Sequence, residues 1–429
     1  SPAGDYHNAR TRRNLGKTAR GNSAAWTFGK HRDMSTSAQP LAFAAALSLQ
    51  QDTTAAAAEA CSLARKSLGS VPDLAVVFFS REHAAQADSL AHQLCDSLGT
   101  ENVVGCSGES IVGVGQEVEE GAAFSVWLAK WPGVTTHLFH LNFERTPEGG
   151  VIQGWPDDLS GEWPEGSFLM LLGEPYSFPA DALLERLNED RTGVAVVGGM
   201  ASGGLTPGEN RLILGRKSFS EGAAAVLVSG PVRLRTIVSQ GCRPIGRHFI
   251  VTKAERNTIH ELGGKPALIQ LKEIFDELPN REKLLVQRAP HLGRVVSEYQ
   301  DKFEQGDFLV RNIIGSDPSG AIAVTDYIRV GQTVQFHIRD QESADAELKQ
   351  LLAAAKKQKP AALGGLLFTC NGRGTRLFGQ PHHDAAAIER ALGKIPLAGF
   401  FAQGELGPIG KQNFMHGFTA SIALFEPVK

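Results

Sequence analysis

The stretch that decides the fold reads LAVVFF at residues 74–79 and VVGCSGE at residues 103–109. The first run is short and apolar throughout, which is typical of a strand buried on both faces of a sheet. Between the two runs, apolar side chains recur at the spacing of one helix face, which predicts a helix over residues 84–98. With a closing strand expected over residues 122–128, the stretch predicts a strand–helix–strand unit closed by a third strand.

The same unit occurs twice more along the chain. FLMLLG at residues 168–173 and LLFTC at residues 366–370 begin the second and third copies. In every copy the strand after the helix ends in glycines, and the later predicted elements are helices over 179–188 and 382–392 and strands over 194–204, 223–228, 396–405 and 418–425. Buried strands that alternate with helices predict an α/β protein with layered mixed sheets in a sandwich.

Composition shifts divide the chain into three predicted parts. Residues 1–33 contain seven Lys/Arg against two Asp, a net charge of +5, and show no apolar period. We expect a basic, disordered tail over residues 1–37. Residues 1–33 are interpreted as a tag, a targeting segment or an over-extended reading frame, so organellar import stays open. Two α/β domains follow over residues 38–235 and 236–429, and the Gly/Pro-rich run from Gly241 to Gly246 is predicted to be the hinge between them.

Bulk composition restricts the class of function. The 429 residues contain 43 Lys/Arg and 46 Asp/Glu, a net charge of −3, so no nucleic-acid partner is expected. No run approaches the length of a membrane span, so no membrane partner is expected. The five cysteines are scattered and form no C-x-x-C pair, which favours free thiols in a reducing, cytoplasmic compartment.

Most enzyme signatures fail when their spacing is tested. The stretch from Gly372 to Gly374 resembles the opening of a dinucleotide fingerprint, but no helix is expected directly behind it. The turn Gly105-Cys106-Ser107-Gly108 is one residue short of a nucleophile elbow. His382 and His383 are adjacent and diverge on a helix, so neither a metal site nor a cofactor is predicted.

The remaining candidates are turns at the ends of strands, where ligands bind in α/β sheets. Glycines let backbone N–H groups approach a ligand, and an arginine fork fits a carboxylate. Taken alone, Arg373 is more simply interpreted as a solvated loop residue and Glu405 as a turn cap. The third unit, however, places both residues on adjacent strand ends. The predicted ligand-binding residues are Cys106, Ser107, Cys370, Asn371, Arg373, Gln403 and Glu405.

Four of these residues, Cys106, Ser107, Gln403 and Glu405, lie in stretches that resemble a known family. The segment from Pro396 to Pro408, followed by His416-Gly417-Phe418-Thr419, resembles the end of a FIST C domain, and Gly241 to Gly246 resembles its start. The strand ending at Gly105-Cys106-Ser107 resembles the FIST N signature. The resemblance covers about residues 38–427. It implies tandem sensory domains that bind small ligands such as amino acids, related to the FIST region of an F-box protein. Because the chain leaves no room for an F-box or a kinase domain, output is expected through a partner protein or through the FIST surface itself.

Three functions are compatible with these features. The leading one is a small-ligand sensory protein of signal transduction, which is not an enzyme. The second is a protein-interaction scaffold, of the type that recruits substrates to a ubiquitin ligase but without the F-box. The third is a thiol-dependent hydrolase or transferase with Cys370 as nucleophile and His382 or His383 as base, which requires a depressed thiol pKa and a base within hydrogen-bond reach.

Overall fold

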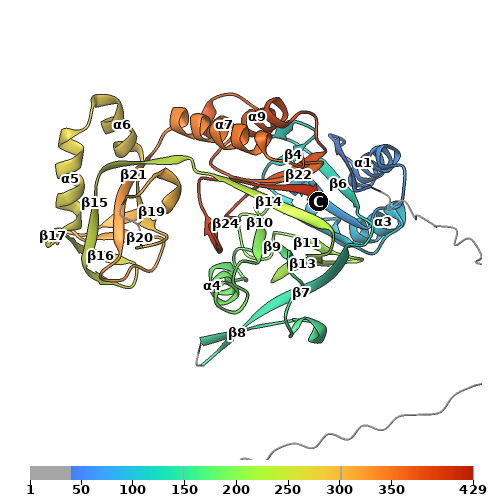
Figure 1. The fold of residues 1–429 in the computed structure, drawn as a ribbon, viewed down its shortest axis with the longest axis horizontal. Coiled ribbons are helices and arrows are strands. Elements are labelled where there is room, and N and C mark those ends of the chain that lie inside the picture. Colours follow the sequence, from blue (N-terminus) through green and yellow to red (C-terminus); the bar gives the residue numbers. More distant parts are fainter. Residues whose placement is uncertain (1–39, 148, 300–301, 429) are drawn as a thin grey trace, which may run out of the picture. The chain divides into compact units, whose positions relative to one another are not determined.

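The computed structural model describes residues 40–147, 149–299 and 302–428 (Figure 1). The predicted tail over residues 1–37 lies outside these residues. The described chain contains four mixed or antiparallel sheets, of which three contain one copy each of the predicted unit and the fourth is an insertion in the third copy. The α/β class with mixed sheets is therefore confirmed.

The first sheet contains the first unit. Its parallel pair β2–β3 is flanked by the antiparallel strand β6, and α1 (Thr53–Leu68), α2 (Arg81–Ala84) and α3 (Ala87–Leu98) belong to the same unit. In spatial order the strands are β1 (Ala42–Ser48), β6 (Phe124–Lys130), β2 (Leu74–Ser80), β3 (Val103–Gly108), β11 (Leu212–Leu214) and β12 (Lys217–Phe219).

The second sheet repeats this plan with the parallel pair β9–β10, the antiparallel strand β13 and the helix α4 (Ala180–Asp190). A short 3-10 turn covers Asp157–Leu159. In spatial order the strands are β25 (Gln412–His416), β24 (Glu405–Ile409), β10 (Ala195–Met200), β9 (Phe168–Gly173), β13 (Ala223–Ser229), β7 (Thr135–Thr146) and β8 (Gly149–Gln153).

The third sheet has the parallel pair β22–β23 and the antiparallel strand β26, with α7 (Gln341–Lys357), α8 (Thr375–Phe378) and α9 (His383–Leu392). In spatial order the strands are β14 (Val232–Ser239), β26 (Ala420–Pro427), β22 (Gly364–Cys370), β23 (Leu397–Ala402), β4 (Ile111–Gly113) and β5 (Gln116–Val118).

The three units exchange hairpins in a cycle. The hairpin β4–β5 of the first unit joins the third sheet, β11–β12 of the second unit joins the first sheet, and β24–β25 of the third unit joins the second sheet. Each sheet therefore needs a strand pair from another unit to be complete. The predicted boundary between two domains at residues 235 and 236 remains a prediction. Strands β4 and β5 belong to the N-terminal predicted domain, but they are hydrogen-bonded into the third sheet, which is built mainly from the C-terminal predicted domain.

One glycine position shows that the three units are structurally equivalent. Gly105, Gly198 and Gly399 each lie opposite a residue of the parallel neighbour, in the registers Val77↔Gly105, Leu171↔Gly198 and Leu367↔Gly399. A Cβ at any of these three glycines would overlap the carbonyl oxygen of that neighbour. Glycine is therefore required here because the two backbones approach too closely for a side chain.

A single apolar core lies between the three sheets, and the helices cover their outer faces. Aromatic rings join the sheets in this core: Trp127 and Phe425 have ring centroids 4.9 Å apart, and Phe78 and Phe400 have centroids 5.1 Å apart. Separate outer cores bury α1 and α3 on the first sheet, α4 on the second, and α7 and α9 on the third. Each fully buried aromatic side chain contributes on the order of 2–3 kcal/mol of hydrophobic stabilisation.

The fourth sheet is inserted between β14 and α7, and we call it the inserted sheet (residues 242–339). Its order is β15 (Cys242–Glu255), β21 (Thr333–Arg339), β18 (Pro290–Val295), β19 (Phe308–Ser316), β20 (Ile322–Val324), β16 (Thr258–Leu262) and β17 (Lys265–Pro266). It has its own core with α5 (Ala267–Glu277) and α6 (Asn280–Arg288), and a 3-10 turn covers Gln305–Asp307. The stretch predicted to be a hinge is not a loop: from Cys242 onward it is the start of β15, paired with β21.

Candidate functional site

The ends of the three parallel pairs meet at one place. Backbone hydrogen bonds run from Ser202 N to Ser107 O (3.1 Å), from Met200 N to Gly404 O (2.9 Å) and from Phe401 N to Ser110 O (2.9 Å). The predicted site residues are therefore brought to connected strand ends, but their surroundings differ.

Cys106 and Ser107 are buried without access to solvent. The Ser107 hydroxyl accepts a hydrogen bond from Arg211 N (2.9 Å), and Cys106 is packed in the central core. Burial raises the pKa of the Cys106 thiol well above its ordinary value. Both side chains hold the strand end together.

Arg373 is not the free fork that the sequence led us to expect. Its guanidinium is fully buried and binds the Asp384 carboxylate bidentately through its Nε/Nη2 edge, Nε to Oδ2 at 2.7 Å and Nη2 to Oδ1 at 2.8 Å. The Thr369 hydroxyl donates to the same carboxylate (2.7 Å). Burial would raise the pKa of Asp384, but the adjacent Arg373 lowers it below its ordinary value. The arginine is therefore used to fix α9 to the end of β22.

Gln403 also lies apart from the other candidates. Its side chain is exposed, and its backbone N donates to Met200 O (3.0 Å). It takes part in the turn between β23 and β24 through its backbone.

Glu405, Cys370 and Asn371 do share one environment at the end of β22. Glu405 is fully buried, and its Oε2 accepts hydrogen bonds from Thr419 N (3.1 Å) and Thr419 Oγ1 (2.8 Å). Its Oε1 has no hydrogen-bond partner by geometry among the described residues, and the Asn371 Oδ1 atom is likewise unpaired. Burial raises the pKa of Glu405 to about 8, although the nearby Cys370 thiol acts to lower it as a hydrogen-bond donor.

Arg339, which the sequence did not single out, completes this environment. It is the last residue of β21 in the inserted sheet, and its guanidinium lies over the Phe418 ring, 5.5 Å from the centroid. A Cβ on Gly372 would lie 2.7 Å from its Nη2 atom, which places the guanidinium directly beside the Cys370–Gly372 turn. Its buried Nε and Nη2 atoms find no hydrogen-bond partner among the described residues.

The charges of Glu405 and Arg339 both act on the Cys370 thiol. Burial and then the charge of Glu405 raise the pKa of the Cys370 thiol to about 12, while Arg339 acts in the opposite direction. Burial lowers the pKa of Arg339, and the nearby thiols of Cys370 and Cys242 partly offset that effect. We call the cluster formed by Arg339, Cys370, Asn371, Glu405 and Phe418 the β22 end site.

The equivalent positions in the other two units show what is unusual here. Ser80, Glu174 and Cys370 each donate a backbone N–H to the closing strand, at 2.9, 2.8 and 2.9 Å. Ser80 Oγ accepts from Ala123 N (3.0 Å), and the Glu174 carboxylate accepts from Tyr176, Ser177 and Asn210. The Ser80 hydroxyl and the Glu174 carboxylate are thus paired within their own units, although His83 Nε2, just after the end of β2, is also buried without a partner among the described residues. The third strand end leaves polar atoms of three side chains unpaired: Arg339, Asn371 and Glu405.

The geometry gives no support to a thiol nucleophile at Cys370. His382 Nδ1 accepts a hydrogen bond from Glu117 N (2.9 Å), and His383 is held between Asp345 (3.0 Å) and Asp384 (2.9 Å). No imidazole is hydrogen-bonded to Cys370 in the described part of the chain, and the thiol pKa is raised where catalysis needs it lowered.

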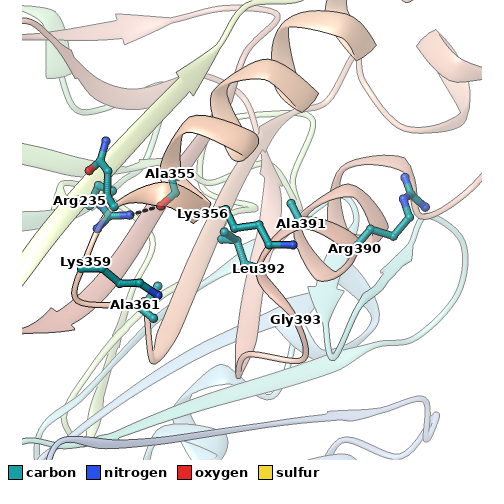
Figure 2. Close-up of a pocket in the computed structure, with 11 residues that line it drawn as sticks. Arg235, Ala355, Lys356, Lys359, Ala361, Arg390, Ala391, Leu392 and Gly393 are labelled. Carbon is teal, nitrogen blue, oxygen red and sulfur yellow. Dashed lines mark hydrogen bonds between the residues drawn. The ribbon is translucent and has the colours of Figure 1, made fainter.

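A separate hollow of about 370 Å³ lies where α7 and α9 end (Figure 2). It contains the cations Arg235, Lys356, Lys359 and Arg390, but Arg235 donates to Ala355 O (2.7 Å), and Figure 2 shows Arg390 pointing away from it. Cations at the carboxyl ends of helices complement the helix dipoles, so this cluster is explained by the fold.

Metal centres and membrane spans are both missing from the described part of the chain. Within residues 40–147, 149–299 and 302–428, no group of three His, Cys, Asp or Glu side chains is arranged to hold a metal ion. No helix in the same ranges has the length and apolar character needed to cross a membrane.

Comparison with known proteins identifies the family. The chain is 45% identical over 382 residues to an uncharacterized protein of Mycobacterium tuberculosis, covering 88% of this chain and 98% of that protein. An uncharacterized protein of Mycobacterium bovis is 43% identical over 377 residues, covering 87% and 96% of the two chains. An F-box/LRR-repeat protein of Arabidopsis thaliana is 24% identical over 156 residues, 34% of this chain and 30% of that protein.

A solved structure of a cyanuric acid hydrolase from A. caulinodans covers 90% of this chain and 99% of its own at 8% identity, with a TM-score of 0.30. The FIST N domain matches residues 73–265 and the FIST C domain matches residues 267–408. The chain belongs to the FIST family, whose N and C domains are sensory domains of signal transduction.

Proposed function

We propose that this FIST protein senses an amino acid or a similar metabolite, and that the ligand binds at the β22 end site. The observation that carries the proposal is the set of buried polar atoms without partners, on three side chains gathered around the end of β22: Arg339, Asn371 and Glu405. A buried donor or acceptor left unpaired costs about 1–3 kcal/mol, so a ligand that pairs several of them gains that free energy on binding.

The residue types fit the two charged ends of an amino acid. The Arg339 guanidinium offers an unused edge, Nε and Nη2, which matches a carboxylate bidentately. Glu405 Oε1 and Asn371 Oδ1 are free acceptors for an ammonium group. Phe418 and the Cys370–Gly372 turn lie beside the guanidinium and would border the ligand.

The rest of the proposal concerns location and output. The cysteines are free in the described residues, which supports a reducing compartment such as the cytoplasm. Because Arg339 is followed directly by Asp340, the N-cap of α7, a ligand held by Arg339 would act at the start of that helix. We propose that a partner protein reads the liganded state.

A thermal-shift panel tests the proposal. The full chain is heated with each of the twenty amino acids, with the matching amines that lack the carboxylate, and with the matching 2-oxo acids that lack the ammonium group. At about 100 times the Kd, a ligand stabilises the native state by about 2.7 kcal/mol, which raises Tm by a few degrees. We expect at least one amino acid to do so, and both truncated analogues to lose the effect.

Two variants connect the shift to the site. Arg339→Gln should abolish it, whereas Arg247→Gln, an exposed arginine of the same inserted sheet, should leave it intact. The proposal fails if no amino acid shifts Tm of the wild type, or if the shift survives in Arg339→Gln.

A further inference from the structure

We propose a second ligand site, for a small molecule that bears a phosphate or carboxylate group, in the cleft between α4 and the inserted sheet. This cleft has a volume of about 870 Å³. One wall is formed by α4 and β25, including Leu184 and Phe414, and the other by β18, β19 and the segment around Asp326. The volume is enough for a metabolite with a ring or chain attached to its charged group.

Two arginines in this cleft share a single carboxylate. Arg294 Nη2 lies 3.4 Å and Arg311 Nε lies 3.3 Å from the same atom, Asp326 Oδ2. Both contacts are long for charge-assisted hydrogen bonds, which are usually about 2.7–2.9 Å. The Arg294 Nε atom is buried and has no hydrogen-bond partner among the described residues. At least one positive charge of the pair is therefore left uncompensated at this carboxylate.

The pair is shielded from solvent, which strengthens its attraction for an anion. The Arg311 side chain is 11% exposed and that of Arg294 is 21% exposed. Half-buried charges are screened much less by salt than exposed ones.

The rest of the cleft adds to the positive charge on this wall. Arg256 and Arg329 also line it, and neither side chain forms an ion pair or hydrogen bond with a described residue. The opposing acids stand on α4: Asp181 reaches Arg311 only at 4.0 Å, and Glu185 lies further along the helix.

This cleft is distinct from the β22 end site. Side chains alternate between the two faces of a strand, so Arg294 points to the opposite face of β18 from His291. The His291 ring packs on Phe418, with centroids 4.5 Å apart, and thus faces the β22 end site. The two sites lie on opposite faces of the inserted sheet, and each has its own arginines.

The chemistry follows from the geometry of the pair. Guanidinium groups on neighbouring strands can each offer two N–H donors to one oxyanion, an arrangement suited to phosphate and carboxylate alike. Leu184, Leu309 and Phe414 provide apolar surface for the uncharged part of the molecule.

Isothermal titration calorimetry of the full chain at low salt tests this site with four probes: inorganic phosphate, citrate, adenosine monophosphate and adenosine. We expect at least one of the three anions to bind and adenosine not to. Binding by phosphate or the monophosphate alone assigns a phosphate ligand, and binding by citrate alone assigns a carboxylate ligand. Arg294→Gln and Arg311→Gln should each weaken the binding at least tenfold, while Arg247→Gln and Arg339→Gln should leave it unchanged.

A variant of the shared carboxylate keeps the test decisive if an arginine variant fails to fold. Asp326→Asn removes the competing negative charge, so it should tighten binding of the anion several-fold. The inference is overturned if no anion binds the wild type, if Asp326→Asn weakens binding, or if the folded arginine variants bind as the wild type does.

Discussion

Replacing Glu405 by glutamine should stabilise the free protein and abolish its response to an amino acid. Glu405 is fully buried, and burial raises its pKa from the ordinary value of 4.5 to about 8. A carboxyl whose pKa is higher in the folded state binds its proton more tightly there than in the unfolded chain. Its contribution to stability is therefore complete below pH 4.5 and is lost as the pH rises towards 8.

The size of this loss follows from the pKa difference. Each pH unit between the two pKa values costs about 1.4 kcal/mol, so wild-type Glu405 reduces the free energy of unfolding by about 3 kcal/mol at neutral pH. The Glu405→Gln side chain resembles the protonated acid and does not titrate. The difference in stability between variant and wild type should be small at pH 5 and should grow to about 3 kcal/mol at pH 7.

Urea unfolding of both proteins at pH 5, 6, 7 and 8 measures this difference, and the other titrating groups cancel in the comparison. Glu174→Gln is the matched control, because Glu174 is equally buried but accepts hydrogen bonds on both oxygens from Tyr176, Ser177 and Asn210. That variant should lose about 1–3 kcal/mol at neutral pH. The reasoning is refuted if Glu405→Gln is less stable than the wild type at pH 7, or if the difference does not change with pH.

Two further predictions concern proton linkage and the glycine positions. Because an ammonium group needs the ionised form of Glu405, binding of an amino acid should release a proton. Below pH 8 the affinity should fall about tenfold for each pH unit by which the pH is lowered. Calorimetry in two buffers of different ionisation enthalpy measures the proton release, and proton uptake on binding would contradict the prediction. Gly399→Ala should destabilise the fold by about 3 kcal/mol or more, because its Cβ would overlap Leu367 O. The control Gly161→Ala has open space around its Cβ and should change stability by less than about 1 kcal/mol. Equal urea midpoints for the two variants would show that the strands can separate without cost.

The repeated unit was predictable because its strands are buried on both faces. Runs such as residues 74–79 and 168–173 are continuously apolar, and the structure confirms them as β2 and β9. The predicted helix over 382–392 matches α9, and the other elements of the third unit were placed within a few residues. Short strands were not predictable: β4, β5, β11 and β12 have three residues each, which is too short for a hydrophobic period.

The exchange of hairpins between units was equally hidden, because it depends on contacts between distant residues. Ile111 pairs with Phe400, and nothing local to either residue indicates the other. The stretch from Gly241 to Gly246 was misinterpreted as a hinge because its Gly and Pro suggest a turn, whereas its pairing with β21 makes it a strand with an irregular register.

The candidate site was only half predictable for a related reason. Glu405 and Asn371 could be found because they follow buried strands. Arg373 was expected to have a free guanidinium, since Asp384 lies 11 residues away and its role as a partner depends on how α9 packs. Arg339 ends an ordinary strand of the inserted sheet, and only the tertiary structure brings it to the Cys370–Gly372 turn.

The difference between the three strand ends is itself an argument for binding. The units are equivalent in their backbone bonds and in the glycines that let their strands approach, so the same local solution was sterically available to all three. Ser80 and Glu174 show that solution, in which the polar side chain at the strand end is paired within its own unit. The third unit instead buries a carboxyl group and a guanidinium that are not paired with each other, at a cost of about 1–3 kcal/mol for each unpaired group. The backbone plan that the three units share does not require these two unpaired groups, and under the proposed function their cost would be recovered when a ligand pairs with both of them.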